Sequence, residues 1–306
     1  MKSDRFAKFR LSSLNAENVV KKQIVIPGQV DYEWVKDKVI NWCSPIQQTD
    51  FNEGEGDFNW EGKLYRPNDL FRVKVLGMFP KVSEDVLIPY EWIEIANRNW
   101  QELQASGFIP AKSCKLGVDV AGMGRDNSVL CPRYGNYVPQ FDVHQSAGRA
   151  DHMHVVGMTI PYLKKKGAKA FIDTIGEGAG VYSRLLEEEF TNAFSCKYSE
   201  GTDGLHDITG EYEFANMRAY LYWALRDWLN PKNGFGAALP PCDQLMEEAT
   251  ETKWKFLSNG KIIIEAKEDI KKRIKRSPDY MDALANTFYP RDYSFISDEE
   301  LLKDFL

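Results

Sequence analysis

The sequence predicts an α/β domain built on a mixed β-sheet, and three observations support this fold class. Three short apolar segments lie between residues 115 and 144, the last two separated by Gly135-Asn136, which is typical of antiparallel strands joined by tight turns. Strand-like and helix-like segments then alternate from residue 150 to residue 230, the pattern of parallel strands with crossover helices. A last amphipathic segment near residue 280 closes the domain. We therefore expect three antiparallel strands followed by parallel strands, all flanked by helices.

The individual elements follow from apolar periodicity and from the residues that end each run. Strands are expected at 116–122, 128–134, 137–144, 168–176 and 193–199. Helices are expected at 150–166, where Pro161 predicts a kink, at 178–190, and at 213–230, which ends at Asn230-Pro231.

The C-terminal part of the domain contains a second hairpin and a closing helix. The hairpin spans 253–266 and has Asn259-Gly260 at its tip. Residues 267–274 then lead into a helix at 277–289, for which Ser277 is the expected N-cap and Pro278 the first helical residue.

Length and charge divide the chain into three parts. Its 306 residues, 43% of them hydrophobic, suffice for about two domains or for one domain with an appendage. We assign 1–110 to an N-terminal appendage, 111–290 to the α/β domain, and 291–306 to an acidic tail. Residues 47–62 contain five acidic residues, no basic residue and three glycines, which favours a solvated loop.

Several classes of protein are excluded by composition. No apolar run reaches the roughly 18–20 residues of a membrane-spanning helix, and residues 1–10 lack the apolar region of a secretion signal. The five cysteines are scattered, odd in number and without CxxC spacing. This pattern argues against a disulfide scaffold or a zinc ribbon and fits a reducing compartment.

Two acidic residues interrupt apolar strands. Asp119 lies within LGVDV, and Asp173 ends FIDTIG before a glycine-rich turn. A carboxylate in such a position is costly unless it is paired, although it can also cap a neighbouring backbone group. Ligands bind at the carboxyl ends of adjacent central strands, so two acids there would face each other across a crevice.

A third element carries two more acids. Asp279 and Asp282 are three residues apart, so they share one face near the start of the closing helix. Taken alone, acids in a first helical turn are ordinary dipole and capping residues. Metal binding better explains why three separate elements each direct an acid to one crevice.

Clustered carboxylates repel one another, so a cation must offset their charge. Mg²⁺ or Mn²⁺ prefers oxygen ligands, and two such ions about 3.5–4 Å apart can clamp the attacking and leaving oxygens of a phosphodiester. Only four histidines are present. His152 and His154 are two residues apart and would point to different helix faces, so a histidine metal site is not expected.

These segments resemble the nuclease domain of a phage terminase large subunit, the DNA-packaging protein of tailed phages. The matching pieces, which appear in family order over roughly 113–290, are GVDVAGMGRDNSVL, FIDTIGEGAGVYSRL, EFANMRAYLYWALRD and GKIIIEAKEDIKKRIKRSPDYMDALANTF. The resemblance implies an RNase H-like fold of the resolvase type. It also implies an endonuclease that cuts concatemeric double-stranded DNA with two Mg²⁺ or Mn²⁺ ions.

The resemblance also assigns roles to individual acids. Asp119 becomes the first-strand metal ligand and Asp173 the fourth-strand ligand. The closing helix supplies the third acid, which the family pattern puts at Asp279, with Asp282 as a second ligand or a partner of the ligands. Asp126 matches a recurrent acid of the first hairpin and is predicted either to touch a metal or to shape the turn GMGRDN.

The N-terminal part resembles the segment that joins the packaging motor to the nuclease, through IPGQVDYEWV, FRVKVLGMFP and EDVLIP. No GxxxxGK[ST] motif is present, so ATP-driven translocation is not assigned to this chain. The chain is then either a fragment or relies on a separate ATPase motor. By resemblance, that motor, the portal and the small terminase subunit are the expected partners, and the bacterial host cytoplasm is the expected location of this phage or prophage protein.

A basic segment precedes the closing helix. Residues 261–276 contain seven basic and three acidic residues, a local charge of +4 that either contacts DNA or is a solvated helix surface. The residues predicted to bind DNA phosphates are Lys267, Lys271, Lys272, Arg273, Lys275 and Arg276.

The net charge of −6 does not oppose DNA binding. Half of it comes from the tail, with two basic and five acidic residues, whereas residues 111–290 carry 23 basic and 24 acidic residues. The net charge of residues 111–290 is therefore −1, and two bound divalent ions would change it to +3.

Two alternative functions remain open at this point. Asp-containing first strands and turns such as DTIGEGAG also occur in actin-like kinases and ATPases, where they hold nucleotide phosphates, although such proteins usually need two copies of the domain. The chain could also be a non-catalytic docking module of the packaging machine.

Overall fold

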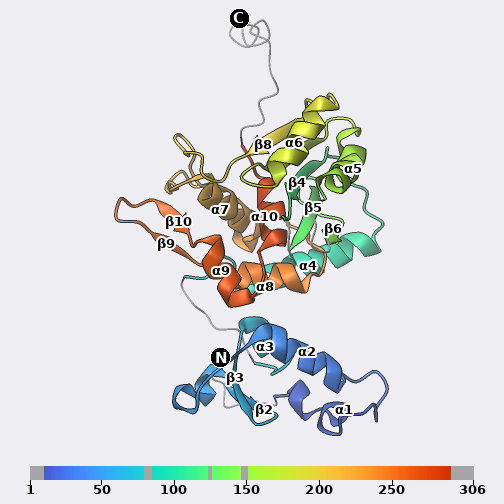
Figure 1. Cartoon of the computed structure of the whole chain (residues 1–306), viewed down its shortest axis with the longest axis vertical. Coiled ribbons are helices and arrows are strands. Elements are labelled where there is room, and N and C mark those ends of the chain that lie inside the picture. The colour runs from blue at the N-terminus through green and yellow to red at the C-terminus, as the bar shows by residue number, and fades with distance from the viewer. Residues whose placement is uncertain (1–9, 79–84, 123–125, 146–150, 291–306) are drawn as a thin grey trace, which may run out of the picture. The chain divides into compact units, whose positions relative to one another are not determined.

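The computed structural model describes residues 10–78, 85–122, 126–145 and 151–290, which belong to two compact units, 1–84 and 85–306 (Figure 1). The predicted acidic tail, 291–306, lies outside the described residues. The second unit begins at Asp85 and not at 111, because α4 (Tyr90–Ala105) packs with it: the side-chain amides of Asn97 and Asn99 donate to the carbonyls of Leu239 and Ala237. Within the described residues, none of the helices combines the length and the apolarity needed to cross a bilayer.

The first unit is a small three-stranded antiparallel sheet packed with short helices. Its sheet has the order β1-β3-β2, formed by β1 (Cys43–Pro45), β2 (Phe58–Trp60) and β3 (Lys63–Pro67). Its helical elements are η1 (Ser13–Asn15), α1 (Glu17–Val20), α2 (Tyr32–Trp42), η2 (Gln48–Asp50), η3 (Glu53–Glu55) and α3 (Asp69–Lys74). The predicted solvated loop at 47–62 is wrong for its last part, because buried Asp57 pairs with Arg66 and Phe58 stacks on Phe71.

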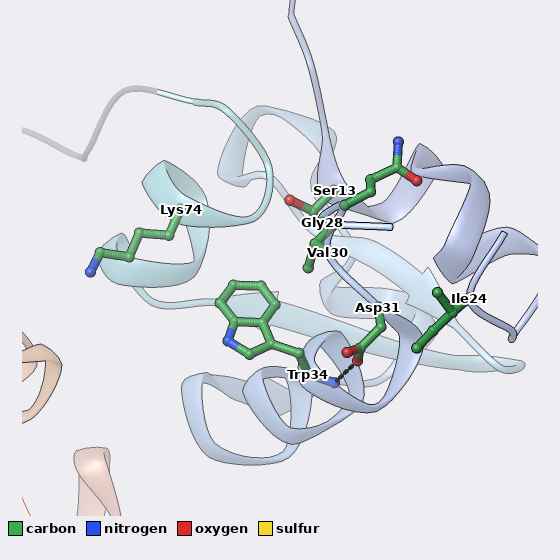
Figure 2. A pocket seen from close by; sticks show the side chains of 8 residues that line it. Ser13, Ile24, Gly28, Val30, Asp31, Trp34 and Lys74 are labelled. Atoms are coloured by element: carbon green, nitrogen blue, oxygen red, sulfur yellow. Dashed lines mark hydrogen bonds between the residues drawn. The ribbon is translucent and has the colours of Figure 1, made fainter. Parts of the chain in front are cut away.

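Figure 2 shows a pocket of this first unit, with a volume of about 590 Å³. Trp34 and Lys74 line it, together with Asp31, whose carboxylate caps α2 by accepting from the Trp34 N–H at 2.8 Å. Asp31 is the one acidic residue among the described residues that line this pocket.

The second unit contains the predicted mixed sheet, which confirms the fold class. Its strand order is β6-β5-β4-β7-β8, antiparallel from β6 to β4 and parallel from β4 to β8. The strands are β4 (Lys115–Asp119), β5 (Asn127–Arg133), β6 (Asp142–Gln145), β7 (Lys169–Asp173) and β8 (Ala193–Cys196). A separate hairpin pairs β9 (Trp254–Phe256) with β10 (Ile262–Ile264).

Helices cover both faces of this sheet (Figure 1). On one face, α5 (His152–Leu163) and α6 (Gly178–Glu187) enclose an apolar cluster that includes Leu116, Val118 and Ile172. On the other face, α10 (Asp279–Asn286) crosses β4 so closely that a Cβ on Gly117 would lie 1.8 Å from the Ala283 carbonyl oxygen. The remaining elements are α7 (Met217–Leu229), η4 (Pro231–Asn233), α8 (Asp243–Glu251) and α9 (Lys267–Ile274).

Some predicted boundaries are wrong. The third strand starts at Asp142 and not at 137, because Tyr137 bridges to Tyr134 and Ala238 instead of extending β6. Asp119 is the last residue of β4 and not a mid-strand residue. Ser277 is not the N-cap of the closing helix: Pro278 holds that position, and the Ser277 hydroxyl instead donates to Asp126 at 3.1 Å.

Candidate active site

The register of the sheet brings the first two predicted acids to neighbouring strand ends. β4 and β7 are parallel with Val118 opposite Ile172, so Asp119 and Asp173 end adjacent strands. Side chains alternate along a strand, and Val118 and Ile172 point into the cluster beneath α5 and α6. Asp119 and Asp173 therefore point to the opposite face, where α10 lies.

The closing helix adds Asp279 and Asp282 to that face. Both are buried, and Asp282 is 0% exposed. The Tyr222 hydroxyl of α7 donates to Asp282 Oδ1 at 2.6 Å, and the Asn127 N–H donates to Asp279 Oδ2 at 3.0 Å. Each carboxylate is thus oriented by a specific donor and not by general helix-dipole chemistry.

A lysine ammonium lies among these acids. Lys267 Nζ is 2.7 Å from Asp282 Oδ2 and 3.9 Å from Asp119 Oδ1. Sequence analysis predicted Lys267 as a DNA contact, but the start of α9 directs it into the aspartate cluster. Its ammonium therefore lies beside one carboxylate of β4 and one of α10, two elements that are far apart in the sequence.

The pKa values of the four acids separate. Burial raises the pKa of Asp119 well above its usual value and the pKa of Asp173 and of Asp279 to about 6. Burial also pushes the pKa of Asp282 upward, but the cations of Lys267 and Arg218 outweigh it and keep this pKa below its usual value. The acid cluster therefore holds one firmly ionised carboxylate, Asp282, two acids that ionise near pH 6, and one, Asp119, whose ionisation burial opposes most strongly.

Asp126 has a separate set of contacts. Its carboxylate lies 2.6 Å from Lys271 Nζ and accepts from the Ser277 hydroxyl, and although burial opposes it, the Lys271 ammonium lowers the pKa of Asp126. Asp126 thus ties the end of the first hairpin to the segment before α10. Residues 123–125 of the predicted turn lie outside the described residues.

A pocket of about 520 Å³ opens beside the aspartates. Asp173, Arg218 and Lys267 line it, with walls from the end of β7, the start of α7, β10 and α9. Arg218 stacks on the Tyr222 ring at 4.5 Å, while its Nε and Nη2 atoms are buried and have no hydrogen-bond partner in the part of the chain that the structure describes. An arginine with unused donors beside carboxylates suits an anionic group such as a phosphate.

The basic residues predicted to bind DNA divide by their contacts. Arg273 pairs with Glu251 at 3.2 Å and with Glu265, and Arg276 pairs with Glu247 at 2.9 Å and with fully buried Glu248. These arginines hold α8 and α9 together. Lys272, by contrast, has a side chain that is 78% exposed.

The donor set fits hard divalent ions, since it is made of carboxylate oxygens. Within the described residues, however, no three of these aspartates bring ligand atoms within 4.8 Å of one another. The Lys267 ammonium lies between Asp282 and Asp119 in this wider arrangement. Two ions about 3.5–4 Å apart can be bound by carboxylates that lie too far from one another to bind a single ion.

Comparison with known proteins yields structural matches only, because no protein-family model and no curated protein matches the sequence. The nuclease domain of the large terminase subunit gp2 of bacterial virus Sf6 aligns with 67% of this chain and 99% of its own, at 22% identity and a TM-score of 0.53. This chain has the fold of a terminase nuclease domain.

Further solved structures agree to different degrees. A mutant of the Sf6 domain with manganese and beta-thujaplicinol gives a TM-score of 0.54 at 20% identity, over the same 67% and 99% of the two chains. The large terminase nuclease from thermophilic phage G20c covers 59% of this chain and 83% of its own at 14% identity, and its TM-score of 0.39 adds no support. The resemblance seen in the sequence is thus confirmed at the level of the fold.

Sequence reasoning missed three contributors to the site. Tyr222 and Arg218 lie in the helix predicted at 213–230, for which the sequence indicates no site residue, and Lys267 is predicted to contact DNA. A polar residue within the apolar helix 213–230 was the available signal for Arg218. Nothing in the sequence indicated that Lys267 Nζ would meet Asp282, fifteen positions further along the chain.

Proposed function

We propose that residues 85–290 form a metal-dependent endonuclease domain that cuts double-stranded DNA by hydrolysing phosphodiester bonds. The observation that carries this proposal is that Asp119, Asp173, Asp279 and Asp282 converge from three separate elements on one face of the sheet, where the Lys267 ammonium contacts Asp282 and Asp119. A cluster of four acids, three of them buried, with one resident cation favours the binding of further cations.

Asp119 and Asp282 are the proposed ligands of a shared ion, which would take the position of the Lys267 ammonium. This reverses the order inferred from the family pattern, in which Asp279 came first. Two observations support the reversal: Lys267 contacts Asp282 and Asp119, and the charge of Asp282 affects the pKa of both Asp119 and Asp173. Asp173 and Asp279 complete the ligand set, and Asp126, which pairs with Lys271, shapes the first hairpin.

When bound, two Mg²⁺ or Mn²⁺ ions would activate the attacking water and stabilise the leaving 3′ oxygen. The protein's own groups would hold the DNA. Arg218, with two unpaired nitrogens at the pocket, is the proposed partner of the scissile phosphate. The Lys267 side chain is 36% exposed, so its ammonium can leave the carboxylates and remain solvated near that phosphate.

Backbone phosphates beyond the pocket are proposed to meet the exposed side of α9. Lys271 and Lys272 are the main candidates there. Lys275 follows α9 with a left-handed backbone (φ 63°), so its side chain leaves the helix in a different direction. Arg273 and Arg276 are proposed to act indirectly, by fixing α9 against α8.

The biological setting proposed for this domain is viral DNA packaging. The cut would trim concatemeric DNA in the cytoplasm of a bacterial host. A separate or attached ATPase motor, the portal and the small terminase subunit would deliver the substrate. This setting rests on the shared fold and on the resemblance of residues 113–290, and not on a contact in the structure.

The decisive experiment is plasmid nicking by the purified full chain in Mn²⁺. The parent should convert supercoiled DNA to nicked and linear forms, whereas Asp119→Ala and Asp173→Ala should be inactive. Asp203→Ala, which removes an exposed acid elsewhere, is the matched control. The proposal fails if the parent leaves DNA intact, or if both site variants cut as well as the control. ATP hydrolysis without cleavage would favour the actin-like alternative, and neither activity would favour a docking module.

A further inference from the structure

A second cluster of metal-ligating side chains lies outside the aspartate site. His144 is near the end of β6, Asp151 is the N-cap of α5, and His154 is in the first turn of α5. One ligand atom from each of the three residues lies within 4.8 Å of the other two. Within the described part of the chain, this is the one triad of histidine, cysteine or acidic residues that meets this spacing. We call it the His-Asp cluster.

The contacts within the His-Asp cluster leave a nitrogen unused. Among the described residues, His144 Nε2 is buried and has no hydrogen-bond partner, although buried polar atoms normally have one. Its nearest acidic neighbour, Asp151 Oδ2, is 3.7 Å away, which is too far for a hydrogen bond. Two ligands of one tetrahedral ion, each about 2.0–2.2 Å from it, stand roughly 3.4 Å apart. The 3.7 Å between His144 Nε2 and Asp151 Oδ2 is therefore close to the separation of two ligand atoms on one ion.

The geometry around these atoms also orients the other two ligands. Asp151 Oδ1 accepts from the His154 N–H at 3.1 Å, so that Oδ2 remains available on the side of His144. The rings of His144 and His154 stack with centroids 3.9 Å apart, so imidazoles from a strand and a helix lie side by side. Because an imidazole binds a metal in the plane of its ring, one of the two rings has to turn when both bind the same ion. His152 is not part of the cluster, since its Nε2 contacts Glu177 at 2.7 Å.

We propose that His144, Asp151 and His154 bind one divalent ion of the zinc class. Two imidazoles and a carboxylate suit Zn²⁺, whereas the all-oxygen aspartate site suits Mg²⁺ or Mn²⁺. Three protein ligands leave a fourth position, which solvent can reach because Asp151 and His154 are exposed. The expectation that the chain has no histidine metal site rests on His152 and His154, whereas the proposed site combines His154 with His144 of β6.

The position of the His-Asp cluster links it to the sheet edge of the candidate active site. His144 pairs with Ser128 on β5, and the residue before Ser128, Asn127, donates its backbone N–H to the Asp279 carboxylate. An ion bound here would join the end of edge strand β6 to the start of α5. The proposal does not depend on nuclease activity, because none of its ligands belongs to the aspartate cluster.

Metal binding by the full chain tests the proposal directly. The parent for these measurements carries Asp119→Asn, which removes a ligand of the aspartate site. Calorimetric titration with Zn²⁺ should give one tight site per chain, and Co²⁺ should give the intense visible bands of tetrahedral coordination. An octahedral, all-oxygen site would give only weak bands, so the spectrum separates the two sites.

The variants His144→Ala, Asp151→Asn and His154→Ala should each raise the Zn²⁺ dissociation constant at least tenfold and remove the Co²⁺ bands. His206→Ala, which replaces an exposed histidine elsewhere, should change neither. Because His154 is exposed, its variant keeps the fold, and its unfolding temperature should no longer rise with Zn²⁺. Absence of a tight Zn²⁺ site in the parent, or unchanged Zn²⁺ affinity in His154→Ala, overturns the proposal. Loss of nicking in Asp119→Asn alone bears only on the nuclease.

Discussion

Replacing Asp282 by asparagine should nearly abolish cutting, whereas Asp279→Asn should only weaken it. The Lys267 ammonium, 2.7 Å from Asp282 Oδ2 and 3.9 Å from Asp119 Oδ1, marks the proposed ion position. Removing one unit charge about 4 Å from a cation costs about 4 kcal/mol at an effective dielectric constant of about 20, and more for a divalent ion. At about 1.36 kcal/mol per decade, Asp282→Asn should lose at least roughly 10³-fold in rate.

Asp279→Asn should lose only about 10–100-fold, as expected for a residue that supports or completes a ligand set. Its carboxylate is held by the Asn127 N–H and forms no ion pair with Lys267 among the described contacts. The two substitutions are otherwise matched, since both replace a buried acid of α10 by its isosteric amide.

Stability is the control for this comparison. In Asp282→Asn the Tyr222 hydroxyl keeps an acceptor, but the ion pair with Lys267 is lost. The Lys267 side chain is partly exposed and can turn to solvent, so the cost should be about 1.5–3 kcal/mol, the range for a hydrogen bond to a charged group. For a domain of this size that is roughly 3–12 °C in Tm, which leaves the protein folded at the assay temperature.

The assay is plasmid nicking in Mn²⁺ at 25 °C, with the Tm of each variant and its Mn²⁺ affinity measured in parallel. If both variants are folded and Asp279→Asn is the more severely impaired, the assignment of Asp282 as the shared ligand is wrong, and the order from the family pattern holds.

Three further predictions concern the cation, the pH and the basic segment. Lys267→Met should lower the Tm of the metal-free protein, because the acids lose the ammonium that offsets their charge. It should also tighten Mn²⁺ binding about tenfold or more, because the ammonium no longer competes with the ion for the carboxylates. A weaker Mn²⁺ affinity by calorimetry would contradict this. Burial raises the pKa of Asp173 and of Asp279 to about 6, so these acids stabilise the metal-free fold least at high pH: its Tm should fall as pH rises from about 4 to above 6. Asp173 and Asp279 must lose their protons to bind a metal, so Mn²⁺ affinity should rise about 100-fold from pH 5 to pH 7, about tenfold for each acid. An affinity that does not change with pH would refute their role as ligands. Arg276→Ala should destabilise the protein by about 3–5 kcal/mol in urea unfolding, since it leaves fully buried Glu248 unpaired. The exposed Lys272→Ala control should stay within about 0.5 kcal/mol, and equal effects would mean that the Glu248 pair is not structural.

Local signals in the sequence were sufficient for the sheet. The Gly135-Asn136 turn and the alternation of strands and helices follow from short-range backbone preferences. They predicted that antiparallel strands precede parallel ones and that Asp173 ends an apolar strand, but they placed Asp119 within a strand that in fact ends at this residue. They did not predict where α10 begins, because the Ser277 side chain that would have capped it donates to Asp126 instead.

The sequence by itself thus determined the fold class of this protein and which acids could meet at one sheet edge, because acids near the carboxyl ends of adjacent strands face the same crevice. Only the tertiary structure decided the partners of the basic and aromatic residues. Lys267 enters the aspartate cluster, Arg276 pairs with Glu248, and His144 reaches His154, each across a different pair of elements. Such contacts depend on how helices are oriented against the sheet, and on the need to compensate every charge that burial removes from water.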